Sequence, residues 1–161
     1  ALVGQITGRQ EQAETLVNEM RQRVDAVVAK TSTVSEKPTV FYEVDATLDE
    51  NNPYTTGKGT FQDALIDLAG GQNIATGPGW YVIDIEEILV SDPDIIILED
   101  YQWGVTPDMV ASRAGWHDLA AVKQGRVYGV EDSNLTCRPG PRIVDGLEML
   151  AMMIHPDLFS E

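Results

Sequence analysis

The chain has few of the residues that perform chemistry or crosslink a fold. Among its 161 residues there are one cysteine, Cys137, and two histidines, His117 and His155. A single cysteine excludes an internal disulfide, and neither histidine has a partner at the spacing of zinc ligands. The serine nucleophile motif G-x-S-x-G is also missing. The sequence therefore predicts no catalytic residue, no metal site and no cofactor of its own.

Positive charge and long apolar stretches are scarce too. The chain has 11 Lys and Arg against 26 Asp and Glu, which gives a formal net charge of −15. Such a field repels nucleic acid and anionic membranes, and favours a positively charged protein surface or a cationic ligand as partner. No apolar stretch approaches the roughly 20 residues of a membrane span, so we expect no membrane insertion in this segment. Ala1 does not open a signal peptide, and we interpret the chain as a segment of a longer protein.

The residues that are present suit one globular domain. Apolar residues make up 43% of the chain, enough for a core at this length. Between Gln10 and Lys30 they recur at steps of three and four, which predicts a long amphipathic helix with Thr7 as a plausible cap. The break that follows, "TSTVSEKP", separates this helix from the rest of the chain.

Strand and helix patterns then alternate. We predict strands at Thr39–Val44, Asn73–Ala75, Ile95–Leu98 and Arg126–Val130. Between and after them we predict helices capped by Thr60, Asp84 and Thr106, a short helix in "WHDLAAV", and a last helix over Pro141–Ile154. Ile95–Leu98 is apolar on both faces, as in a buried parallel strand. The pattern predicts a three-layer, Rossmann-like α/β fold with a mostly parallel sheet flanked by helices, preceded by the long helix.

Aromatic residues stand where ligands bind in such folds. Open α/β sheets place their ligands at the carboxyl ends of the strands, in the loops that follow. Several predicted loops carry Tyr or Trp there, and we interpret "NPYTTG" as a turn inside the long polar loop after the first strand. We expect these loops to form a shallow apolar cleft with a polar anchor. The candidate ligand-binding residues are Tyr54, Trp80, Tyr81, Tyr101, Trp103, Asn134 and Arg138.

Four stretches together resemble a known family. They look like the carboxyl-terminal lobe of the helical-backbone substrate-binding proteins of ABC importers for cobalamin, iron-siderophores and haem. That family has two α/β lobes joined by one long helix, with the ligand between them. The resemblance implies that residues 1–36 are the connecting helix and linker, that residues 37–161 are the carboxyl-terminal ligand-binding lobe, and that the amino-terminal lobe is absent from this chain. The stretches are "NNPYTTGKGTFQDALIDLAGGQNIA", "IEEILVSDPDIIIL", "AVKQGRVYGV" and "RPGPRIVDGLEMLAMMIHPDLF".

The resemblance also implies roles for single residues. Glu86 matches the exposed glutamate that each lobe of the family offers to an arginine pocket on the permease. Trp80 matches an aromatic offered to the corrin, and Arg138 matches a ligand-facing arginine. Leu135 departs from the pattern, because some cobalamin binders carry an aromatic there.

That departure leaves a ferric siderophore or haem open as the ligand. A haem axial ligand would come from His, Tyr or Met, and Tyr54 or Tyr101 are candidates. The function that follows is a non-catalytic, extracytoplasmic carrier, periplasmic or anchored at the cell surface, that delivers a metal chelate to an ABC permease. An isolated lobe would also expose apolar surface, so we expect it to be prone to self-association.

Two alternatives remain open at this point. The first is a small Rossmann-like enzyme domain that binds a nucleotide or sugar at the strand ends, with Asp84, Glu86 or Asp100 as acid or base. The second is a partner-binding module in which the strand-end aromatics form an interface hot spot.

Overall fold

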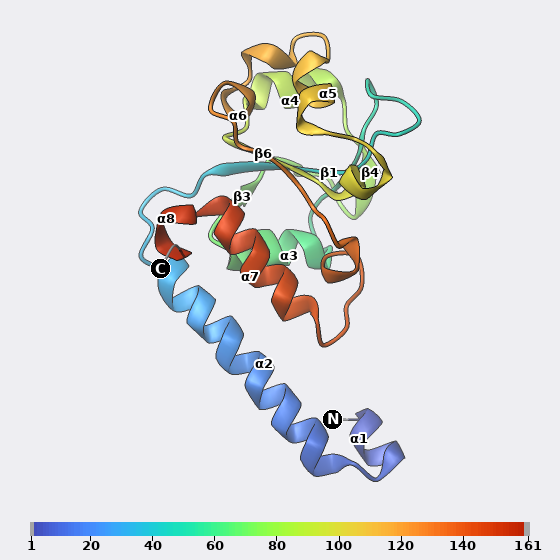
Figure 1. Cartoon of the computed structure of the whole chain (residues 1–161), viewed down its shortest axis with the longest axis vertical. Coiled ribbons are helices and arrows are strands. Elements are labelled where there is room, and N and C mark those ends of the chain that lie inside the picture. Colours follow the sequence, from blue (N-terminus) through green and yellow to red (C-terminus); the bar gives the residue numbers. More distant parts are fainter. Residues whose placement is uncertain (1, 160–161) are drawn as a thin grey trace.

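A long helix projects from an α/β lobe and carries a shorter helix folded back at its free end. The computed structural model describes residues 2–159, with α1 at Leu2–Thr7 and α2 at Gln10–Thr31 (Figure 1). A Cβ at Gly4 would lie 2.5 Å from Ala13 Cβ, so glycine permits the close contact between the two helices. The long helix is confirmed.

Thr7 does not cap the long helix, and that prediction was wrong. Thr7 ends α1, where its hydroxyl donates to the Val3 carbonyl at 2.8 Å. Gly8 follows with φ of +67°, which turns the chain, and Arg9 precedes α2 without a side-chain cap. A left-handed glycine therefore separates two helices at the point where a single helix start was expected.

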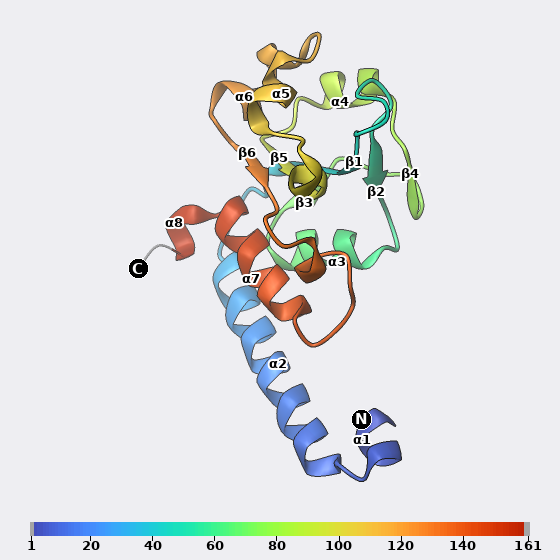
Figure 2. The same cartoon turned by 45° about the vertical axis from the view of Figure 1, so that its right-hand side comes forward.

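The sheet has a parallel centre and an antiparallel edge. In the described residues its strands run in the order β4-β2-β1-β5-β6, with β3 beside the first half of β1. β1 pairs in parallel with β3 and β5, and β5 with β6, whereas β2 is antiparallel to β1 and β4. Figure 2 shows β2 and β4 at one side of the sheet and β6 at the other. The strands are β1 (Thr39–Asp45), β2 (Tyr54–Thr56), β3 (Gln72–Asn73), β4 (Trp80–Val82), β5 (Ile95–Leu98) and β6 (Val127–Gly129).

Two of these strands were expected to be loops. The predicted turn at Tyr54 is strand β2, and Trp80 and Tyr81 belong to strand β4 rather than to a loop after a strand. Both strands have three residues, too few for a period-two pattern to show in the sequence. Their pairing depends on β1 offering a free edge, which is a property of the folded sheet.

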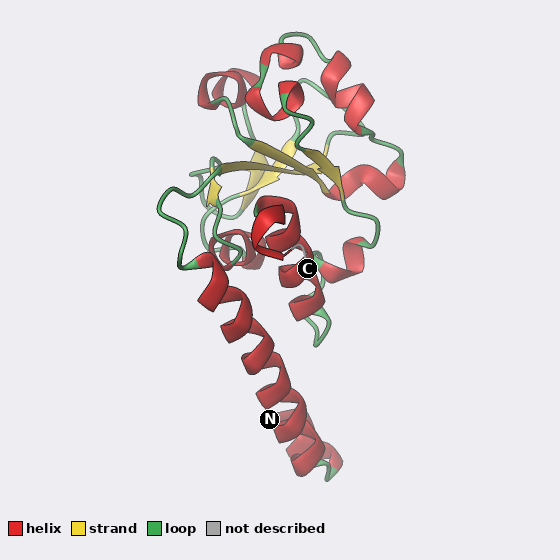
Figure 3. Ribbon diagram, turned by 60° about the vertical axis from the view of Figure 1, so that its left-hand side comes forward, coloured by secondary structure: helices red, strands yellow, loops and turns green. Residues whose placement is uncertain are grey.

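Helices cover both faces of the sheet, with α3, α7, α8 and the end of α2 on one side and α4, α5 and α6 on the other (Figures 1 and 3). Thr60, Asp84 and Thr106 accept from backbone N–H groups two or three residues on, as predicted. "WHDLAAV" is broken at Leu119 into a 3-10 turn and a helix. The bounds are α3 (Phe61–Leu68), α4 (Ile85–Ser91), α5 (Pro107–Ser112), α6 (Ala120–Lys123), α7 (Ile143–Ile154), α8 (Pro156–Phe159), and the 3-10 turns η1 (Glu99–Trp103), η2 (Trp116–Asp118) and η3 (Ser133–Leu135).

The core consists of two layers that share the central strands. All four residues of β5 are fully buried: Ile95 and Ile97 join the cluster on the α3–α7 side, and Ile96 joins the one on the α4–α6 side with Trp116. Each such side chain stabilises the fold by roughly 1.5–3 kcal/mol on burial. The predicted three-layer α/β fold with a mostly parallel sheet is confirmed.

Candidate binding site

The carboxyl ends of the central strands meet at one edge of the sheet. β5 and β6 pair through to Leu98 and Gly129, and β1 pairs with β5 through Glu43. β2 runs the other way, and its first residue, Tyr54, lies opposite Asp45 at the end of β1. Tyr54 therefore lies at the predicted edge although its strand is antiparallel.

Tyr54 and Trp80 form one exposed aromatic patch. In the β2–β4 register Tyr54 lies opposite Val82, and Thr56 lies opposite Trp80. The exposed side chains of Tyr54, Trp80 and Val82 therefore lie on neighbouring strands. The Tyr54 hydroxyl donates to the Trp80 carbonyl at 3.3 Å. The Trp80 ring packs edge-to-face on Phe61, with 6.2 Å between ring centroids, and remains 47% exposed. Half of a flat indole is thus available to a ligand.

A hollow of about 370 Å³ adjoins this patch. Val44, Leu48, Tyr54 and Val82 supply its apolar wall, and Asp45, Asp49 and Asn52 supply its polar side. The Leu48 side chain is 96% exposed at the tip of the loop between β1 and β2. Asn51 and Asn52 hold Asp49 by hydrogen bonds, and these bonds lower the pKa of its carboxyl group.

Tyr81 lies apart from this patch. It alternates with Trp80 and Val82 along β4 and packs against the core on the α4–α6 side. Its phenol oxygen accepts a hydrogen bond from the Gly77 backbone at 3.2 Å. Any Cβ at Gly77 would lie 2.8 Å from the Tyr81 ring, so the glycine loop closes over the phenol. These contacts give Tyr81 a structural role.

Tyr101, Trp103, Asn134 and Arg138 form a second group, carried by η1 and by η3 and its following turn. Trp103 is 61% exposed and Tyr101 37%, and Asn134 and Arg138 are exposed. The two turns are joined by a hydrogen bond from Gln102 Nε2 to Ser133 Oγ. A Cβ at Gly129 would lie 2.2 Å from the Tyr101 ring, so glycine at the end of β6 makes room for that ring.

Three buried acids, Glu43, Glu99 and Asp100, lie between these two groups at the same edge. Glu43 receives two hydrogen bonds from Arg113, at 2.5 and 2.8 Å, and that guanidinium stacks on Trp116. Asp100 Oδ2 accepts from the Ala46 N–H at 2.8 Å. Burial, and next the charge of Glu43, raise the pKa of Asp100 to about 7.

Sequence reasoning missed Glu43, Glu99 and Arg113, because charged residues usually lie at the surface. The one signal was the pair Glu99-Asp100 directly after the apolar run "IIIL". Asp84, named as a possible acid or base, accepts from the Glu86 N–H at 2.8 Å and so caps α4. Glu86 and Glu87 are exposed in the first turn of that helix.

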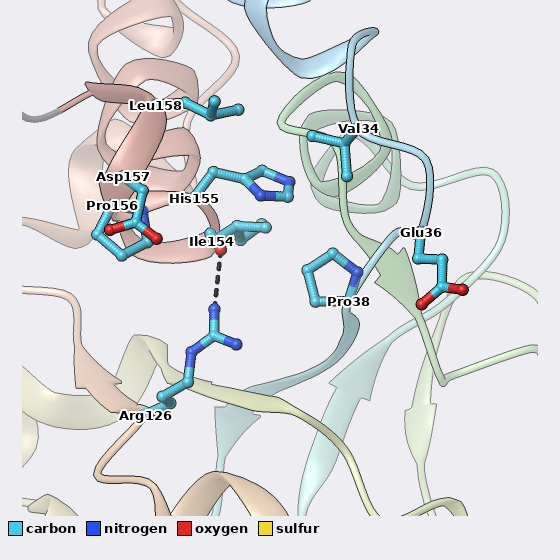
Figure 4. A pocket seen from close by; sticks show the side chains of 9 residues that line it. All are labelled: Val34, Glu36, Pro38, Arg126, Ile154, His155, Pro156, Asp157 and Leu158. Atoms are coloured by element: carbon cyan, nitrogen blue, oxygen red, sulfur yellow. Dashed lines mark hydrogen bonds between the residues drawn. The ribbon is translucent and has the colours of Figure 1, made fainter.

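Another hollow, of about 450 Å³, lies at the opposite edge, where the strands begin (Figure 4). Arg126 donates to the Ile154 carbonyl at 2.8 Å, and the His155 ring pairs with the Gly70 carbonyl at 3.1 Å. Both contacts tie the end of α7 to neighbouring segments. None of the predicted ligand-binding residues lines this hollow.

Two features are absent from residues 2–159. No group of three or more His, Cys, Asp or Glu side chains there is arranged to hold a metal ion. The helices of the same residues are each too short or too polar to cross a membrane.

Comparison with known sequences points to one family. The sequence profile described as "Periplasmic binding protein" matches residues 1–133. An uncharacterized ABC transporter substrate-binding lipoprotein of Bacillus subtilis is 37% identical over 163 residues, covering 99% of this chain and 50% of the relative. A cobalamin-binding protein of Halobacterium salinarum is 31% identical over 168 residues, covering 96% and 42%. The chain thus spans about half the length of the curated relatives it matches.

Solved structures agree on the fold. A possible iron-binding, periplasmic solute-binding protein of Staphylococcus epidermidis has a TM-score of 0.81 at 32% identity, covering 95% of this chain and 58% of that one. A periplasmic heme-binding protein of Roseiflexus has a TM-score of 0.83 at 21% identity, covering 97% and 60%. At that identity the second likeness shows the fold alone.

Proposed function

The chain belongs to the periplasmic binding protein family, and from that premise we propose that it is the carboxyl-terminal lobe of a carrier for a metal chelate. The family is one of binding proteins rather than enzymes. The observation that carries the proposal is the exposed aromatic patch of Tyr54 and Trp80, which reaches the carboxyl edge of the sheet, where this fold class binds ligands, at Tyr54 and Val82. The cargo would be held and released unchanged.

The chemistry of the edge suits a large, flat or aromatic-rimmed ligand. The half-exposed Trp80 ring supplies apolar area, with Tyr54 and Val82 beside it. Arg138, exposed on the turn after η3, supplies a cation for a carboxylate or chelate oxygen. Cobalamin, haem and ferric siderophores all combine such features, and the relatives described above include a cobalamin-binding protein and a possible iron-binding protein. We propose one of these chelates as the cargo.

The proposed partner is an ABC permease, outside the cytoplasm. One relative is a substrate-binding lipoprotein of an ABC transporter, which supports a periplasmic or surface-anchored location. Glu86 is exposed at the start of α4, where its carboxylate remains hydrated until a partner docks. A guanidinium on the permease would then bind it through two hydrogen bonds.

We further propose that residues 1–36 connect this lobe, residues 37–161, to an amino-terminal lobe. α1 and the first half of α2 extend away from the sheet (Figure 1). Leu2, Val3 and Ile6 on α1 are 68%, 73% and 77% exposed. In the whole protein a second lobe would cover these side chains, and without it they favour self-association of the isolated lobe.

A titration of the full-length protein tests the proposal. Cyanocobalamin, haemin and a set of ferric siderophores are added in turn, and binding is followed by visible absorbance and calorimetry. We expect one chelate to bind, and Trp80→Ala to weaken it at least about fivefold, since a stacked aromatic contributes about 1 kcal/mol or more. Trp80→Phe, which keeps a ring, is the matched control. Absence of binding across the whole set contradicts the proposal.

The thermal midpoint of Trp80→Ala separates a rim role from a core role. Trp80 is half exposed and its described ring contact is with Phe61, so we expect the substitution to lower the free energy of unfolding by about 1 kcal/mol or less. A loss of several kcal/mol would mean that the ring is part of the core, as Trp116 is.

A further inference from the structure

Glu99 is a buried carboxylate that joins three separate segments of the chain. It follows Leu98 at the carboxyl end of β5 and is 2% exposed. It accepts hydrogen bonds from the Tyr42 hydroxyl of β1, from Thr136 Oγ1 at 2.9 and 3.0 Å, and from Cys137 Sγ at 3.1 Å. A carboxylate has only acceptor sites, and here every described side-chain partner is a donor.

The donors remain protonated near neutral pH. Burial, and then the charge of Glu99, raise the pKa of Tyr42. Burial, and then the hydrogen bond to Glu99, raise the pKa of the Cys137 thiol. The arrangement of one acceptor group and three donors therefore persists near neutral pH.

Two of those donors, Thr136 and Cys137, belong to the segment that contains η3. We call residues 132–138 the η3 turn, and this turn presents Asn134 and Arg138 at the surface. The flank of this turn is held by Asp132, which accepts from Arg142 at 2.8 Å, and by α7. A Cβ at Gly146 of that helix would lie 2.3 Å from the Leu135 carbonyl oxygen, so the turn packs directly on the helix backbone.

Glu99 holds the base of the same turn. Its partners Thr136 and Cys137 lie immediately before Arg138, and η1, which begins with Glu99 itself, carries Tyr101 and Trp103. One carboxylate thereby links both 3-10 turns of the candidate edge, beside the hydrogen bond from Gln102 to Ser133.

The geometry points to Glu99 as a positioning residue: it anchors the η3 turn so that Asn134 and Arg138 are held in place for the ligand. This inference rests on the proposed function, and goes beyond it by assigning a role to a residue that the ligand does not touch. Glu99→Gln keeps the shape but replaces one acceptor oxygen by an N–H₂ donor that faces other donors. The turn then loses part of its attachment while β5 keeps its backbone pairing.

Hydrogen exchange followed by mass spectrometry measures this effect without any ligand. In the full-length protein we expect Glu99→Gln to accelerate amide exchange in residues 132–138 by about tenfold, the effect of losing a hydrogen bond to a charged group. Exchange in residues 95–98 should stay as in the wild type. Asp100→Asn is the matched control, because the neighbouring acid binds Ala46 instead and should leave the turn unchanged. Unchanged exchange in the turn, or equal acceleration throughout the sheet, overturns the anchoring role.

Titration of the same proteins with cyanocobalamin, haemin and the same set of ferric siderophores tests the consequence for binding. We expect Glu99→Gln to weaken the bound chelate roughly fivefold, because the ligand must order a loosened turn, while Asp100→Asn has no such effect. A loosened turn with unchanged affinity would leave Glu99 a purely structural role and overturn the inference. If the wild type binds none of these chelates, the proposed cargo fails and the binding role with it, while the exchange result still decides whether Glu99 anchors the turn.

Discussion

Glu86 and Asp100 are both acidic, and they lie at opposite extremes of exposure. Glu86 projects from the first turn of α4 into solvent, whereas Asp100 is fully buried at the end of β5. The two carboxyl groups therefore contribute differently to the free energy of unfolding. An exposed carboxylate at a helix start stabilises the fold by only about 0.3–1 kcal/mol, so its larger effect would appear when a partner desolvates it.

Glu86→Arg should impair delivery and leave cargo binding intact. Reversal of the charge would place like charges together at the proposed arginine pocket, and we expect transport in cells or vesicles to fall at least about tenfold. The affinity for the chelate should change less than about twofold, because Glu86 is not part of the aromatic patch. Glu87→Arg is the matched control on the next residue. Equal losses of transport and of chelate affinity would remove the docking role.

Asp100 should make stability fall as pH rises. The unfolded carboxyl group releases its proton near pH 4, and the folded one holds it until about pH 7. The stabilisation is therefore complete below about pH 4 and is lost as pH rises through 7, by an amount on the order of a few kcal/mol. Denaturant midpoints at pH 5 and pH 8 for the wild type and Asp100→Asn test this. Parallel pH profiles for the two proteins would show that Asp100 does not titrate as described.

At the scale of single elements, α2 has two halves with different surroundings. Its carboxyl half is held by buried Val27 and Thr31, and Arg23 binds Glu148 and Asp145 of α7 at 2.6 to 2.8 Å. Leu16, in the amino half, is 41% exposed. A helix held at one end should open first at the other.

Val27→Ala and Leu16→Ala compare the two halves in the 161-residue chain. We expect Val27→Ala to lower the free energy of unfolding by about 2 kcal/mol, because it leaves a cavity in the core. Leu16→Ala should change it by about 0.5 kcal/mol or less. Denaturant unfolding measures both. Similar losses would mean that the amino half of α2 packs on something in solution, such as a second copy of the chain.

The elements also show which parts of the fold the sequence could predict. Long periodic segments such as Gln10–Thr31, and the fully apolar β5, were predicted because their patterns repeat over enough residues. β2 and β4 were missed because three-residue strands beside Gly and Pro look like turns. The buried acids were missed because their partners come from distant segments: Arg113 is 70 residues from Glu43, and Thr136 is 37 from Glu99. A topological rule predicts the site residues at the carboxyl edge of the sheet, yet the rule could not assign Tyr81 to the core side.

At the scale of the whole molecule, two edges of the sheet compete as binding sites. The carboxyl edge has the aromatic patch, the η3 turn and a hollow of about 370 Å³. The amino edge has a hollow of about 450 Å³ whose polar groups, Arg126 and His155, bind backbone carbonyls. Of these two hollows the one at the amino edge is larger, whereas exposed aromatic area and fold topology favour the carboxyl edge.

The most direct measurement is the hydrogen-exchange footprint of a bound chelate on the full-length protein. We predict slower amide exchange in residues 54–56, 80–82 and 132–138 when the chelate identified by titration is present, with residues 34–38 and 154–158 unchanged. Protection confined to residues 34–38 and 154–158 would mean that the cargo binds at the opposite edge of the sheet, and the proposed site would be wrong.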